Sequence, residues 1–148
     1  MNHQIAGHCH CRSVRVILET AQSAQALPLR ACQCSFCRTR GAITTADPAG
    51  HLFVEAAPGS LNTYRFGLQI TDFLLCDECG TYVAATMQID GRPMAVVNVR
   101  GTQPHERRPG IERIEHRPDV LRALHADPER EERRCFLLVE PDREQVPT

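Results

Sequence analysis

Short alternations of apolar and polar residues run through the first hundred positions of the chain. Val14, Val16 and Leu18 alternate with polar neighbours, and this pattern predicts a half-buried strand over residues 12–19. Further strands are predicted over residues 27–31, 51–55, 61–66, 72–75, 81–87 and 94–99, with a short extended piece at 42–45. Asp90-Gly91 predicts a hairpin turn between the last two long strands.

Helical patterns are weak until late in the chain. Residues 118–124 predict one or two helical turns, and residues 135–140 predict a last strand. Between them, residues 129–134 form a charged run that we expect to be solvated, whereas residues 101–117 show little periodicity. The predicted fold is therefore mainly β, with many short strands in a folded or barrel-like sheet and few short helices.

The length of 148 residues predicts a single domain, which we place at residues 1–140, with residues 141–148 as a frayed tail. Only 5% of the residues are aromatic and none is Trp, so aliphatic side chains must fill most of the core. The chain is long enough to bury one.

The balance of charge argues against nucleic acid as a partner. The net charge is −1 and the pI is about 6.6, whereas binding to a phosphate backbone calls for a basic excess. The start of the chain does not resemble a secretory signal, and no stretch approaches the roughly 18 apolar residues of a membrane span. We therefore expect a cytoplasmic protein with no membrane partner.

All 17 basic residues are Arg, so no Lys can hold a carbonyl substrate as a Schiff base. Any aldehyde chemistry must then use a metal, a cysteine or an external thiol. Seven of the eight cysteines fall in three close groups, at residues 9–11, 32–37 and 76–79, and Cys135 stands apart. In a reducing compartment such groups indicate metal binding or catalysis more often than disulfides.

The densest group is the triplet Cys32, Cys34 and Cys37, spaced C-x-C-x-x-C. On an extended segment Cys32 and Cys34 point to the same side, and a tight turn would return Cys37 to the same point. Three thiolates leave one position of a tetrahedral zinc ion open, as in catalytic rather than structural zinc sites. We therefore assign a catalytic zinc to these three residues.

A second zinc site is predicted from two smaller groups. Cys76-x-x-Cys79 followed by Gly80 is a zinc-knuckle pattern that supplies two ligands, and Cys9 and Cys11 can supply the other two. Spacing alone also permits Cys76 and Cys79 to join Cys32 and Cys34. We favour the four-plus-three division, with one structural and one catalytic zinc, because the three cysteines of the triplet already form one face of a tetrahedral site without further ligands.

Other candidate ligands and binding residues carry weaker signals. Surface positions are expected for His8 and His10, and a buried apolar role is expected for Cys135. The isolated histidines are possible acid–base residues or a fourth ligand of the triplet: His51, His105, His116 and His125. Ser35 is expected to form local hydrogen bonds, whereas Arg38 and Arg40 are either surface charges or receptors for a substrate carboxylate.

Taken together, the motifs resemble the glutathione-dependent formaldehyde-activating enzyme family, also called the centromere protein V family. The resemblance covers about residues 5–100 and is carried by Gly7-x-Cys9-x-Cys11, by Cys32-x-Cys34-Ser35-x-Cys37-Arg38 with Gly41-Ala42, and by Phe73-x-x-Cys76-x-x-Cys79-Gly80. Family members often carry His between the first two cysteines of the triplet, where this chain has Gln33.

The resemblance implies a β-tent fold of antiparallel sheets and the same two zinc sites. It also implies carbon–sulfur lyase chemistry on a small-molecule thiol or thiol–aldehyde adduct, such as S-hydroxymethylglutathione. The alternative is a non-enzymatic zinc module in which both metals are structural and the surface binds a protein partner. A Cys32→Ser variant separates the enzyme from the non-enzymatic module, because the enzyme should lose turnover and stay folded, whereas the module should unfold. A count of metal ions per chain tests both interpretations.

Overall fold

The computed structural model describes residues 2–102, 111–114 and 137–138, and the following statements concern those residues. They form two sheets and one short helix, α1 (Ser35–Arg40). The prediction of a mainly β fold with short, largely antiparallel sheets is confirmed. None of the helices in these ranges has the length and apolar character needed to cross a membrane.

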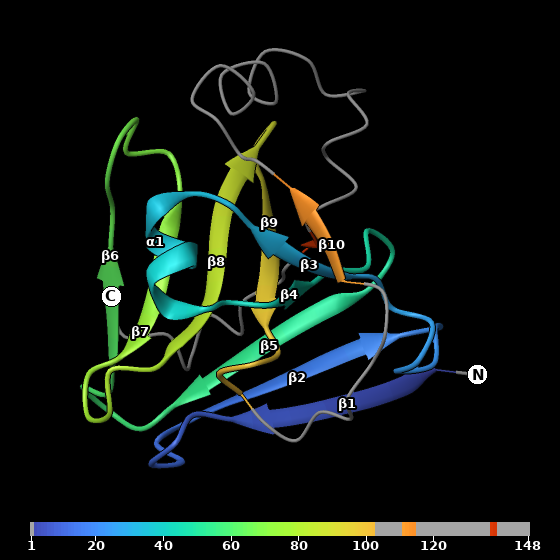
Figure 1. The fold of residues 1–148 in the computed structure, drawn as a ribbon. Helices are drawn as coiled ribbons and strands as arrows, with labels where there is room; N and C mark the ends of the chain where they lie inside the picture. Colours follow the sequence, from blue (N-terminus) through green and yellow to red (C-terminus); the bar gives the residue numbers. More distant parts are fainter. Residues whose placement is uncertain (1, 103–110, 115–136, 139–148) are drawn as a thin grey trace.

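The smaller sheet has three antiparallel strands in the order β1 (His3–His8), β2 (Val14–Thr20) and β5 (His51–Ala56). Val16 lies opposite Val54 and Leu18 lies opposite Leu52, and all four side chains are buried. The alternation that predicted β2 therefore separates a core face from a solvent face. In Figure 1 this sheet lies below the larger one.

The larger sheet runs in the order β10-β3-β4-β9-β8-β7-β6, and β11 pairs with β9. Its strands are β3 (Leu29–Cys32), β4 (Thr44–Thr45), β6 (Leu61–Tyr64), β7 (Asp72–Cys76), β8 (Tyr82–Ile89), β9 (Arg92–Asn98), β10 (Ile111–Ile114) and β11 (Leu137–Leu138). Asp90 and Gly91 both have positive φ and form the expected turn between β8 and β9.

An aromatic cluster holds α1 against the larger sheet. Phe36 of α1 is buried, and its ring centroid lies 4.3 Å from that of Phe73 in β7 and 5.0 Å from that of Tyr82 in β8. Tyr64 and Phe66 stack on the same ring at 5.8 Å. Aromatic residues are few, but these five gather around Phe36 and anchor the helix that carries part of the cysteine triplet.

Three elements were not predicted. The first strand, β1, has no clear alternation, α1 is too short to show helical periodicity, and β10 pairs in parallel with the distant β3. Leu137–Leu138 lies within the last predicted strand. The helix predicted at 118–124, the charged run at 129–134, Cys135 and the tail at 141–148 lie outside the described residues, and the domain boundary stays a prediction.

Candidate metal centres

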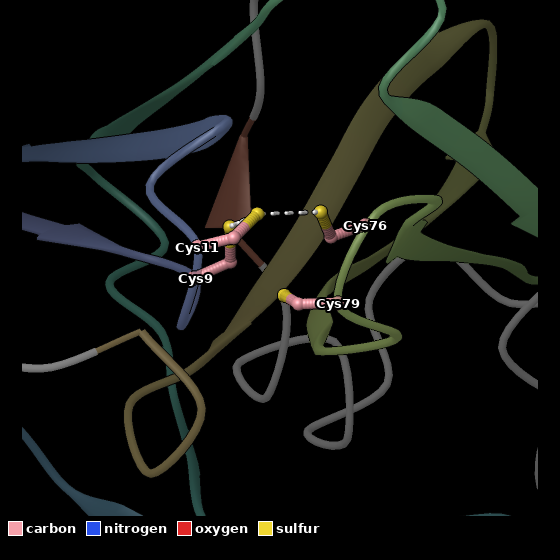
Figure 2. Close-up of side chains that lie close together, drawn as sticks. All are labelled: Cys9, Cys11, Cys76 and Cys79. Atoms are coloured by element: carbon pink, nitrogen blue, oxygen red, sulfur yellow. Dashed lines mark hydrogen bonds between the residues drawn. The ribbon is translucent and has the colours of Figure 1, made fainter.

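Four cysteines from two distant segments converge in one cluster (Figure 2). Cys9 and Cys11 lie in the loop between β1 and β2, whereas Cys76 ends β7 and Cys79 lies in the turn before β8. The four Sγ atoms all lie within 4.8 Å of one another. The alternative grouping, in which Cys76 and Cys79 join Cys32 and Cys34, is therefore wrong.

Local backbone conformations shape this four-cysteine cluster. In the turn after β7, Gly80 has φ +75° and donates its N–H to the carbonyl of Cys76 at 2.9 Å, which folds Cys79 back towards Cys76. Cys9 and Cys11 lie on a turn, with Arg12 at φ +69°. This turn brings the sulfurs of the two residues to 3.6 Å.

The thiols of the four-cysteine cluster differ in acidity. Burial raises the pKa of Cys76 to about 12. Burial also opposes ionisation of Cys79, but hydrogen bonds from Thr81 and from the backbone outweigh it and lower the pKa of Cys79 to about 5. The cluster therefore disfavours four thiolates at once unless a cation compensates their charge, and four convergent sulfurs are the donor set of a structural zinc site.

The triplet forms a second cluster at the junction of β3 and α1. Cys32 ends β3, Cys34 caps the N-terminus of α1 in an extended conformation (φ −64°, ψ 156°), and Cys37 lies within the helix. Their Sγ atoms also lie within 4.8 Å of one another. The extended Cys32–Cys34 segment is confirmed, whereas Cys37 is positioned by a helix rather than by a tight turn.

Negative charge in the triplet is favoured at Cys34. Hydrogen bonds from the thiols of Cys32 and Cys37 lower the pKa of Cys34 to about 2, and the backbone N–H of Cys37 also lies 3.4 Å from its sulfur. The hydrogen bond with Cys34 raises the pKa of Cys32, and hydrogen bonds with Cys32 and Cys34 raise the pKa of Cys37. The pKa of Tyr82 is raised first by burial and then by the negative charge of the three cysteines. Three thiolates would therefore need a cation between them.

A pocket of about 440 Å³ adjoins the triplet. Its lining residues come from the end of β3 and the position after it, from α1 and the segment that follows it, and from the turn after β9: Ala31, Cys32, Gln33, Cys37, Arg38, Gly41, Ala42, Ile43 and Arg100. Arg38 therefore lies on this pocket, whereas Arg40 stacks its guanidinium 3.8 Å above the Phe36 ring. No pattern in the sequence indicated that Arg100 lines this pocket, because only folding brings it next to Gly41.

The histidines in the described ranges lie outside both clusters. His8 places its Nδ1 2.8 Å from the carbonyl of Cys9, so it contacts the backbone of the loop and not the sulfurs. The expected surface position is confirmed for His10, which is exposed, whereas His8 is half-buried. His105, His116 and His125 lie outside the described residues.

Comparison with known proteins agrees with these features. A model of the family described as glutathione-dependent formaldehyde-activating enzyme matches residues 4–114. A crystal structure of a Rhodobacter sphaeroides protein, determined in a structural genomics programme, is similar to this chain with a TM-score of 0.59 and 28% identity, covering 74% of this chain and all of the other. No curated protein matches.

The family match includes both cysteine clusters and all residues that line the pocket. It extends over well more than half of the chain, from β1 to β10. The chain therefore belongs to the glutathione-dependent formaldehyde-activating enzyme family.

Proposed function

We propose that the protein is a zinc-dependent carbon–sulfur lyase that forms or breaks the adduct of a thiol and an aldehyde, of the S-hydroxymethylglutathione type. Family membership supports the substrate class. The two cysteine clusters support a requirement for zinc, because thiolates are common zinc ligands in closed sites and also occur in catalytic ones.

The observation that carries the proposal is the difference between the two clusters. Cys9, Cys11, Cys76 and Cys79 supply four sulfurs, enough to saturate a tetrahedral ion, and none of them lines the pocket. The triplet supplies only three sulfurs, and Cys32 and Cys37 line the pocket of about 440 Å³. A three-ligand site beside a pocket suits a metal that exchanges a substrate ligand.

The reaction itself is an addition that needs no oxidant. A bond forms between the thiol sulfur and the aldehyde carbon, and the thiol proton passes to the carbonyl oxygen; the reverse reaction breaks the same bond. A zinc ion held by Cys32, Cys34 and Cys37 would supply Lewis acidity that makes the substrate thiol more acidic. The protein's own residues would bind the ion, shape the pocket and orient the thiol.

We place this activity in a reducing compartment such as the cytoplasm. All seven cysteines of the described residues are free, and their sulfurs converge without disulfides. Free thiols at this density are maintained where thioredoxin and glutathione keep cysteines reduced.

The test is to mix the zinc-loaded protein with formaldehyde and glutathione and to measure the rate of adduct formation and breakdown by exchange NMR. We expect a rate above the spontaneous reaction, and a Cys32→Ser variant that stays folded but loses the rate enhancement. No enhancement for any thiol would contradict the proposal. Unfolding of Cys32→Ser, together with inactivity of the parent protein, would favour the non-enzymatic zinc module.

A further inference from the structure

The pocket beside the triplet has a positive lining. Arg38 and Arg100 both line it, Gln33 is neutral, and no Asp or Glu stands among the lining residues that the structure describes. Both arginines are exposed, and neither forms an ion pair with another residue in the described part of the chain. Guanidinium groups without a carboxylate partner, on a small-molecule pocket, are suited to bind a carboxylate.

Arg100 is held in place by a hydrogen bond to Gly41, another residue of the pocket lining. Its Nη1 donates to the carbonyl of Gly41 at 2.8 Å. Gly41 is the left-handed C-cap of α1 (φ +59°), and a Cβ there would lie only 3.2 Å from the same Nη1. Glycine therefore permits both the turn and the close approach of Arg100. One donor is used in this contact, which leaves others for a ligand.

Hydrogen bonds to three carbonyl groups at the end of α1 weaken their repulsion of an anion. The N–H of Gly41 donates to the carbonyl of Arg38, and the N–H of Ala42 donates to that of Cys37. The carbonyl of Gly41 accepts from Arg100. Among the described lining residues the opposing charge is that of the triplet, where three thiolates around a divalent ion would leave a net charge of about −1. Two guanidinium groups are enough to offset this charge.

We propose that Arg38 and Arg100 make the site selective for thiols that carry a carboxylate, by binding that carboxylate while the thiol lies at the triplet. This inference rests on the proposed function for the position of the thiol. It assigns a specificity role to two residues that bind no metal. The pocket volume of about 440 Å³ is within the range of small-molecule sites, so it can hold a thiol longer than two or three carbons.

The experiment compares two thiols of equal length, 3-mercaptopropionate and 3-mercaptopropanol, with formaldehyde as the aldehyde. For the zinc-loaded protein we expect KM to be about tenfold lower for the carboxylate thiol. Arg38→Gln and Arg100→Gln should each raise that KM by about fivefold and leave the KM of the alcohol unchanged, because each removes one charge-assisted contact. Arg92→Gln is the matched control, since Arg92 lies at the far end of β9 and does not line the pocket.

Calorimetric titration of each thiol without formaldehyde, at constant ionic strength, separates this inference from the proposed function. Tighter binding of 3-mercaptopropionate that depends on both arginines supports the inference even if no thiol is turned over. Equal affinity of the two thiols for the parent protein would overturn it.

If Arg38→Gln and Arg100→Gln weaken the binding of both thiols equally, the inference is also overturned. Such a result would indicate a general structural effect, which does not distinguish a carboxylate from a hydroxyl. Arg100→Lys keeps the charge and can still reach towards Gly41. If Arg100 binds the carboxylate, this variant should recover part of the preference for 3-mercaptopropionate that Arg100→Gln loses.

Discussion

The Sγ of Cys11 lies 3.6 Å from the Sγ of Cys76, although the two residues are 65 positions apart. Cys11 belongs to a loop of the smaller sheet, whereas Cys76 ends a strand of the larger sheet. Figure 2 shows how the two loops present their sulfurs to one another. A metal ion bound between them would link the two sheets, so the four-cysteine cluster and the triplet should respond differently to mutation.

Replacement of one cysteine in each cluster tests this difference. Cys76→Ser should lower the free energy of unfolding by about 3 kcal/mol or more, because it removes a ligand of the ion that links the sheets. Cys32→Ser should cost less stability and abolish turnover, since the triplet lies within one local segment. Thermal unfolding by circular dichroism and an adduct-formation assay measure the two effects. Equal destabilisation by both substitutions would contradict the assignment of separate roles.

Removal of metal should proceed in two stages. The protein as purified should contain about two zinc ions per chain, one for each cluster. A chelator should first remove the ion of the three-cysteine site, with loss of activity, and then the ion of the four-cysteine site, with loss of folded structure. A zinc-sensitive dye and far-UV circular dichroism, recorded on the same sample, follow the two stages. A single release step that coincides with unfolding would speak against an exchangeable site.

Asn98 should be one of the most sensitive polar residues. Its side chain is only 4% exposed, it donates Nδ2–H to the carbonyl of Tyr82 at 2.9 Å, and it accepts from the N–H of Ile43 at 3.2 Å. Asn98→Ala leaves two buried backbone groups without partners and should cost about 2–3 kcal/mol. Asn62→Ala is the control, because Asn62 is exposed and should change stability by about 0.5 kcal/mol or less. Urea denaturation of both variants measures the difference, and equal midpoints would refute it.

Phe36 should position the cysteine triplet through its packing in the core. Its ring is 5% exposed and contacts four other aromatic rings, and it lies between Cys34 and Cys37 in the chain. Phe36→Ala should cost about 3–5 kcal/mol and should weaken zinc binding at the triplet while sparing the four-cysteine cluster.

Tyr64→Ala serves as the comparison for Phe36→Ala, because Tyr64 is 47% exposed and contributes one ring at the edge of the same aromatic cluster. A competition titration with a chelator measures the affinity of each site. If Phe36→Ala leaves both affinities unchanged, α1 does not depend on this ring to position the triplet.

Local patterns in the sequence were enough for much of the fold. The alternation of Val14, Val16 and Leu18 predicted β2, and Asp90-Gly91 predicted the turn between β8 and β9, because each depends on backbone preferences of a few adjacent residues. The short spacing of Cys32, Cys34 and Cys37 likewise predicted one convergent group. The six-residue helix that carries Cys37 was missed, since so few residues show no helical period.

The sequence by itself determined which residues could bind metal, because ligand chemistry and close spacing are properties of the local chain. Only the tertiary structure decided that Cys9 and Cys11 join Cys76 and Cys79, and that Arg100 lies on the pocket beside Arg38. Those contacts bring together residues about 60 or more positions apart, and they depend on how the two sheets and α1 pack. Hydrophobic packing of distant elements sets these positions, and no local pattern records them.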